Sequence, residues 1–94
     1  MAKAFIVKAG DTFSTPIEPK NGSKFELEEL QEIVGGFIQL LYYDNGIVVC
    51  DEEGKLKDKP FNTMATFIAH GNRALAPQDF LVGDVLFCAD DQID

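Results

Sequence analysis

Four polar residues have the types and spacing to bind a small anion: Lys55, Asn62, Thr66 and Arg73. Lys55 and Arg73 supply positive charge. Asn62 and Thr66 stand one helical turn apart at the start of a predicted helix, whose free N–H groups attract anions. This set predicts a site for a small nucleotide-like ligand. The alternative is structural, with Asn62 capping the helix and Thr66 bonding back to the helix backbone.

Three residues could supply nucleophilic or acid–base chemistry: Cys50, His70 and Cys88. A single histidine cannot build a multi-histidine metal site. Both cysteines fall in apolar stretches with strand character, where a packed and unreactive thiol is the norm. The sequence contains no zinc-type cysteine spacing, nucleophile motif or glycine-rich phosphate loop. We therefore predict a non-enzymatic protein without a metal or cofactor, and a pairing of His70 with one cysteine stays open as the alternative.

The chain is strongly acidic, with sixteen Asp and Glu against eight Lys and Arg and a net charge of −8. Nonspecific nucleic-acid binding requires clustered Lys and Arg, so we expect none. The carboxylates serve solubility, or they form an interaction surface that imitates DNA or meets a basic partner. The residues assigned to this predicted surface are Glu28, Glu29, Glu32, Glu52 and Glu53.

Hydrophobic spacing and turn signals predict an α+β fold in the order β-β-α-β-β-α-β. We expect a curved, mostly antiparallel sheet of about five strands, with one clear helix and one short helix. The expected strands are 3–8, 13–18, 37–43, 47–50 and 85–89, and the expected helices are 25–34 and 63–70. Residues 1–94 should form one domain, with 89–94 as a frayed acidic tail.

The first helix has recognisable ends. Glu26 is the predicted N-cap, and Gly35 can adopt the left-handed conformation that stops a helix. Leu30 and Val34 recur at helical spacing on its apolar side. The residues expected to face water are Glu28, Glu29 and Glu32.

The segments before and after Asn45-Gly46 predict a β-hairpin. A two-residue turn at this point puts Leu41 opposite Cys50. One face then carries Leu41, Tyr43, Val48 and Cys50, and the other carries Ile38, Leu40, Tyr42 and Val49. Because both faces are largely apolar, the hairpin should be covered on both sides. A sheet that partly closes into a barrel and a homo-oligomer formed through the hairpin are the two alternatives.

Nothing in the sequence predicts secretion or membrane insertion. The first residues hold only a short apolar run, and no segment approaches the ~20 apolar residues that span a bilayer. Two cysteines are fewer than a small secreted domain usually carries, so we expect free thiols. The predicted location is the cytoplasm.

Three segments together resemble domain-of-unknown-function family 3846: FELEELQEIVGGFIQL at 25–40, DEEGKLKDKPFNTMAT at 51–66 and VGDVLF at 82–87. The family pattern is a leucine-rich helix ending in VGG, a strand, an acidic turn, a Pro-x-Asn and a closing strand that begins with GD. Glu26 stands where the family usually has Thr, and Asp51 where Asn is common. The resemblance implies a small protein of phages, plasmids or other mobile elements of gut-type bacteria, and the family has no established activity.

The sequence therefore favours a binding or interaction module that acts on an unknown host protein or on a copy of itself. One alternative is an acidic anti-defence inhibitor that mimics DNA through the predicted glutamate surface. The other is a small nucleotide-binding protein that uses the predicted anion set. An enzyme is the least supported class.

Overall fold

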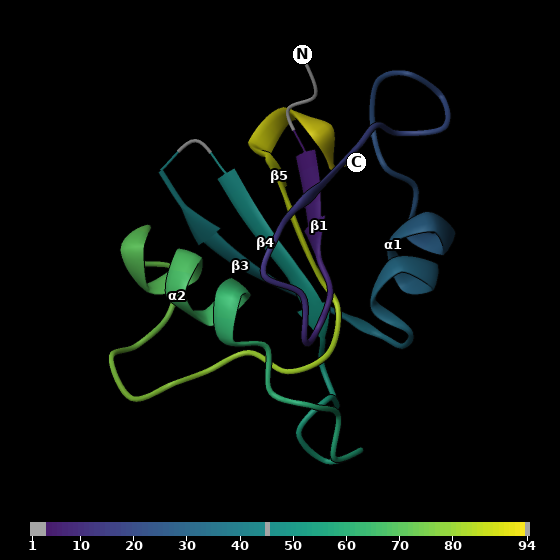
Figure 1. Ribbon diagram of the computed structural model, residues 1–94. Helices are drawn as coiled ribbons and strands as arrows, with labels where there is room; N and C mark the ends of the chain where they lie inside the picture. The colour runs from purple at the N-terminus through teal and green to yellow at the C-terminus, as the bar shows by residue number, and fades with distance from the viewer. Residues whose placement is uncertain (1–3, 45, 94) are drawn as a thin grey trace.

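The computed structural model describes residues 4–44 and 46–93, and these form an α+β fold in the predicted element order (Figure 1). The elements are β1 (Ala4–Val7), β2 (Thr15–Ile17), α1 (Leu27–Val34), β3 (Ile38–Tyr43), β4 (Gly46–Asp51), α2 (Thr63–Gly71), β5 (Val85–Ala89) and a short 3₁₀ helix, η1 (Asp90–Gln92). The five strands lie in the order β2-β1-β5-β4-β3. Each neighbouring pair is antiparallel.

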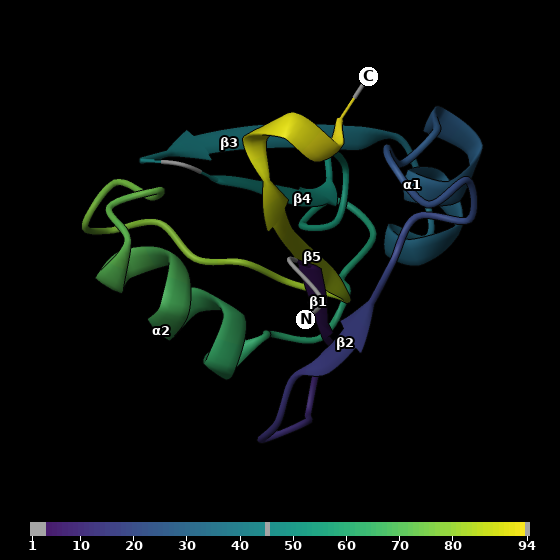
Figure 2. The same cartoon turned by 90° about the horizontal axis from the view of Figure 1, so that it is seen from above.

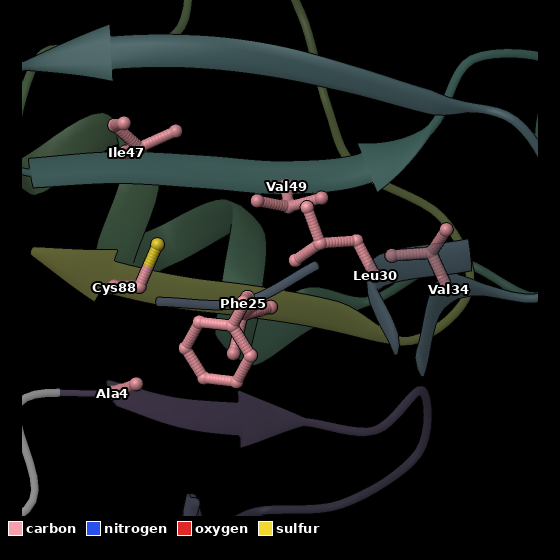
Figure 3. Close-up of a cluster of buried hydrophobic side chains, with 8 residues drawn as sticks. Ala4, Phe25, Leu30, Val34, Ile47, Val49 and Cys88 are labelled. Atoms are coloured by element: carbon pink, nitrogen blue, oxygen red, sulfur yellow. The ribbon is translucent and has the colours of Figure 1, made fainter. Parts of the chain in front are cut away.

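The two central strands, β4 and β5, explain why the hairpin is apolar on both faces. Side chains alternate across a strand, so neighbouring residues enter different cores. Val49 packs with Leu30 of α1 on one face (Figure 3), whereas Val48 packs with Ala65 and Ala69 of α2 on the other. Two helical layers therefore cover the sheet, and across the described residues it stays open instead of closing into a barrel (Figure 2).

Glu26 is the N-cap of α1, as predicted, but a buried carboxylate secures this end of the helix. The Glu29 side chain accepts hydrogen bonds from the N–H groups of Glu26, at 3.3 Å, and Lys20, at 2.9 Å. Glu29 is only 8% exposed, so the expectation that it faces water was wrong. The physical reason is that it joins the helix to the loop before it. Gly35 ends the helix with φ 76°, as predicted.

The β3–β4 hairpin is confirmed, but its register differs from the predicted one by two residues. Leu41 lies opposite Val48, and the pairing extends to Tyr43 opposite Gly46. Asn45, one half of the predicted turn, lies outside the described residues. Because side chains repeat every second residue along a strand, a shift of two residues leaves each side chain on its predicted face.

Gly46 gives the reason for the shift. It belongs to β4 and lies between Tyr43 on one side and Ala89 on the other. A Cβ atom at Gly46 would overlap the ring of Tyr43, so the strand needs a glycine where the ring crosses it. The asparagine–glycine pair therefore marks a close approach inside the sheet as well as the nearby turn.

The predicted frayed tail is folded through residue 93. The carbonyl of Gln92 accepts a hydrogen bond from the N–H of Phe25, at 2.7 Å, and its side-chain oxygen accepts one from Ala89. Ile93 forms an isolated β-bridge with Phe25. These contacts fill the core beside α1, so residues 90–93 are not frayed as expected. The acidic, turn-like sequence of the tail gives no local sign of them. Among the described residues, neither α-helix has the length and apolar character needed to cross a membrane.

Candidate functional site

A cleft of about 240 Å³ opens beside the turn that follows β4. Its walls come from the β3–β4 hairpin, the 51–59 turn and the 75–82 loop. Leu41, Cys50 and Leu81 form an apolar part of the lining, and Gln39 and Glu52 are exposed at its polar part. The combination of a small apolar recess and a polar edge suits the capture of one side chain or a small ligand group.

Exposed apolar side chains stand at this cleft, and we call Leu56, Phe61 and Phe80 the rim patch. Leu56 is 84% exposed, Phe61 50% and Phe80 39%. The rings of Phe61 and Phe80 lie 5.5 Å apart, centroid to centroid. The ammonium group of Lys55 sits 4.3 Å from the centre of the Phe80 ring, where a cation–π attraction holds it.

Lys55 also contacts the carboxylate of Asp79, which lines the same cleft. The hydrogen bond from Lys55, followed by one from the N–H of Phe80, lowers the pKa of Asp79. Both side chains are about half exposed, so solvent competes for this contact. A ligand group could therefore displace either partner at small cost.

The thiol of Cys50 lines the cleft but is a poor nucleophile. Burial, together with the nearby carboxylates of Asp51 and Asp79, raises the pKa of Cys50 to about 11. Its sulfur makes weak contacts of 3.9 Å with Gln39. The site therefore keeps a protonated thiol at neutral pH, the reverse of what thiolate chemistry requires.

The other two candidates for chemistry are separated. Nε2 of His70 lies 2.8 Å from the backbone oxygen of Asp79, so its hydrogen bond serves the loop. Cys88 belongs to the core under α1, whereas His70 is on α2, across the sheet. Burial raises the pKa of Cys88 to about 11 as well. The predicted alternative of a cysteine–histidine pair therefore gains no geometric support from Cys88.

Behind the cleft, Asp51 organises the turn. Its carboxylate meets Nζ of Lys59 at 2.6 Å and Nζ of Lys57 at 2.9 Å, and it accepts a hydrogen bond from the N–H of Glu53. Burial acts to raise the pKa of Asp51, but these three donors outweigh it and lower the pKa to about 2. Lys59 also donates to the carbonyl of Val34, at 2.6 Å, which closes the C-terminal end of α1.

Glycines from the three segments that carry the family resemblance lie close to these ion pairs. A Cβ atom at Gly36 would lie 2.5 Å from Nζ of Lys57, and one at Gly83 would lie 2.8 Å from Cδ of Lys59. Gly54 is packed in the same way against Val82. Segments 25–40, 51–66 and 82–87 therefore meet at the Asp51 ion pairs. Close packing accounts for Gly36 and Gly54, whereas Gly35 and Gly83 also have positive φ.

Two of the four predicted anion-binding residues are buried in structural roles. The side-chain amide of Asn62 donates to the carbonyls of Val7, at 2.9 Å, and Gly83, at 2.8 Å, while its oxygen accepts from the N–H of Ala65. The hydroxyl of Thr66 accepts from the N–H of Leu81, at 2.9 Å. The start of α2 is therefore capped by its own side chain, which is the structural alternative stated for Asn62.

The other two predicted residues lie elsewhere. Lys55 is in the cleft, and Arg73 is an exposed residue with φ 61° just after α2. The structure therefore does not bring the four side chains together with polar groups that are free to bind one ligand. Of the predicted glutamate surface, Glu28 and Glu32 are exposed on α1, and Glu52 and Glu53 are exposed on the turn. Lys20 lies 4.0 Å from Glu32, so lysine is interleaved with the carboxylates.

The sequence pointed to Lys55 but missed the rest of the cleft, because its walls are far apart in the chain. One local signal was present: Leu56, Phe61 and Phe80 are large apolar residues inside turn-like, polar segments. In residues 4–44 and 46–93, no three His, Cys, Asp or Glu side chains are grouped so that they could hold a metal ion.

The comparison with known families finds a match. The model of the domain of unknown function DUF3846 matches residues 2–94, which is nearly the whole chain. Comparisons with curated proteins and with solved structures gave no match.

Proposed function

The chain belongs to the DUF3846 family, and on that premise we propose that it is a non-enzymatic protein-binding module that docks its partner at the cleft and the rim patch. The proposal includes a bacterial cytoplasmic setting and a gene carried by a phage or other mobile element. The motif resemblance supports that origin, and the free thiols of Cys50 and Cys88 suit a reducing compartment.

The observation that carries the proposal is the exposure of the rim patch next to an apolar recess. Single exposed apolar residues are ordinary, but grouped aromatic side chains beside a pocket are typical of interaction sites. Phe61 and Phe80 contact each other, and Phe80 and Leu56 line the cleft itself. An apolar side chain of a partner would fill the recess and cover the rings.

The charge of the site indicates the chemistry of the partner. Glu52 and Asp79 line the cleft, in a chain with a net charge of −8. A basic protein with an apolar side chain next to a Lys or Arg fits this surface, since the cation would meet these carboxylates. Such attraction speeds association and weakens as salt is added.

The two earlier alternatives receive less support from the geometry. A DNA mimic needs a continuous stripe of carboxylates, but Glu29 is buried and Lys20 lies beside Glu32. A nucleotide site built on Asn62 and Thr66 lacks free polar atoms, because both side chains are bound to the backbone.

The test compares protein captured from bacterial lysate by the immobilised chain and by a Phe61→Ser, Phe80→Ser double variant. We expect a specific basic protein on the wild-type chain and at least about tenfold less on the double variant. Phe13→Ser is the matched control, because Phe13 is 58% exposed but precedes β2 at the far edge of the sheet. The control should capture as much as the wild type, and capture should fall with added salt.

Two results would overturn the proposal. One is equal capture by the wild type and the double variant, with both shown to be folded by thermal melting. The other is a wild-type chain that retains no protein at micromolar concentration.

A further inference from the structure

The two edges of the sheet differ in their protection against pairing. β2 is only three residues long and contains Pro16, which cannot donate a ladder hydrogen bond. β3 is six residues long, with neither proline nor charge from Ile38 to Tyr43. Figure 2 shows β3 along the outside of the sheet. An uncharged edge of this length is a template for another strand.

The hydrogen-bonding groups at that edge can be assigned. The N–H of Glu52 donates to the carbonyl of Phe37 at 2.8 Å, which makes these two residues a hydrogen-bonded pair of the β3–β4 ladder. In an antiparallel ladder such pairs alternate with pairs that point away. The N–H and C=O groups of Ile38, Leu40 and Tyr42 are therefore directed to the open edge.

We propose that β3 pairs with β3 of a second copy of this chain, antiparallel and centred on Leu40. All three outward residues are then used, since Leu40 faces its own counterpart and Ile38 faces Tyr42 of the second copy. A two-fold axis normal to the sheet keeps the faces in register, so α1 of both copies lies on one side. Phe37, 63% exposed, and Tyr42, 67% exposed, become covered at the interface between the two copies.

Charge complementarity favours the second copy as the occupant and fixes this register. Asp44, the exposed residue that follows β3, comes opposite Gly36 of the other copy when the proposed register is extended beyond the strand. Nζ of Lys57 lies directly over Gly36, on the face to which even-numbered residues of the strand point. The lysine side chain is 40% exposed. Each end of the interface therefore gains an Asp44–Lys57 contact between copies. A register shifted by two residues would lose both contacts.

The proposed β3–β3 interface rests on observations separate from the proposed docking of a partner. It would nevertheless bring two docking sites together, because Gln39 and Leu41 of β3 line the cleft. In the proposed register each Gln39 lies opposite Leu41 of the other copy. The two clefts would then lie on one face of the dimer, on either side of the β3–β3 interface.

The first test measures self-association by sedimentation equilibrium from low to hundreds of micromolar. We expect a monomer–dimer equilibrium in the wild type. Tyr42→Pro should weaken it at least about tenfold, because proline removes one donor from the open edge and none from the β3–β4 ladder. Asp44→Lys should weaken it as well. Thr15→Lys, a charge at the β2 edge, is the matched control and should leave it unchanged.

The second test fixes the register by cross-linking. Under oxidising conditions Leu40→Cys should form a disulfide between copies, since the two residues face each other. Tyr42→Cys is more exposed but faces residue 38 of the other copy, so it should not. A wild-type chain that stays monomeric at all concentrations would falsify the proposal. Cross-linking of Tyr42→Cys without Leu40→Cys would overturn it too, and loss of dimer in the Phe61→Ser, Phe80→Ser variant would move the interface to the cleft.

Discussion

The segment that follows β4 holds lysine–aspartate contacts in two settings. At the end of β4, Asp51 is shielded from water and binds Lys57 and Lys59 of this segment, whereas at the surface Lys55 contacts Asp79 in the open cleft. Removing one partner of a buried pair leaves an uncompensated charge, but exposed pairs contribute little. Similar residue types a few positions apart therefore differ in what they contribute to stability: the inner set holds the fold, and the outer set contributes little.

The largest effect should come from the inner set. Asp51→Ala leaves Lys59 without its carboxylate and removes the acceptor for the N–H of Glu53. We expect a loss of about 3–5 kcal/mol in the free energy of unfolding, measured with urea. Glu52→Ala removes an exposed carboxylate next in the chain and should change stability by less than about 0.5 kcal/mol. Equal losses in the two variants would erase the distinction between inner and outer residues.

Asn62 extends the inner set, because its amide joins α2 to β1 and to the start of β5 through three hydrogen bonds. Asn62→Ala should destabilise the protein by about 2–3 kcal/mol, through the lost cap and two unpaired carbonyls. Thr63→Ala, at the exposed neighbouring position, is the control for helix propensity. A loss confined to about 0.5 kcal/mol, the size of a propensity effect, would remove Asn62 from the inner set.

The next largest effect on stability should come from acid, which protonates Asp51 and breaks its contacts with Lys57 and Lys59. The pKa of Asp51 is lowered from its ordinary 3.8 to about 2 in the folded protein. Its contribution to stability is therefore fully present above about pH 4 and is lost as pH falls from about 4 to 2, an effect of about 2 kcal/mol. Unfolding free energies of the wild type and Asp51→Asn should converge across that range. A constant gap between the two curves would show that the charge of Asp51 is not what stabilises the turn.

The smallest effect on stability belongs to the outer set. Lys55→Met keeps a flexible chain over the ring of Phe80 but removes the charge that contacts Asp79. We expect a change below about 0.5 kcal/mol in unfolding free energy, with a clear change in partner capture. Lys20→Met, which removes a surface lysine near Glu32, should leave capture as it is. A destabilisation above about 2 kcal/mol would place Lys55 with the inner set.

The element order, the stop at Gly35 and the cap at Asn62 could be predicted because each rests on neighbours in the sequence. The faces of the hairpin were also predictable, since a side-chain period of two survives a register shift of two. Its register was not, because Gly46 was needed under the ring of Tyr43, and nothing local distinguishes that need from a turn.

The cleft and the buried role of Glu29 escaped prediction for one reason. Each depends on segments that meet only in the folded protein, such as the loop before α1 for Glu29 and the 75–82 loop for Lys55. The same remoteness hid the other partners of Asn62, which are Val7 and Gly83, and the partner of Thr66, which is Leu81. Types of residue were visible in the sequence, and their partners were not.

The place of β5 has a consequence for how this chain can be made. It follows all the other strands in the sequence, yet it lies between β1 and β4 and pairs with both. Until Val85–Ala89 has left the ribosome, β1 and β4 have no common neighbour and the hairpin keeps an apolar edge exposed. The sheet therefore assembles after synthesis of this strand and not progressively from the N-terminus.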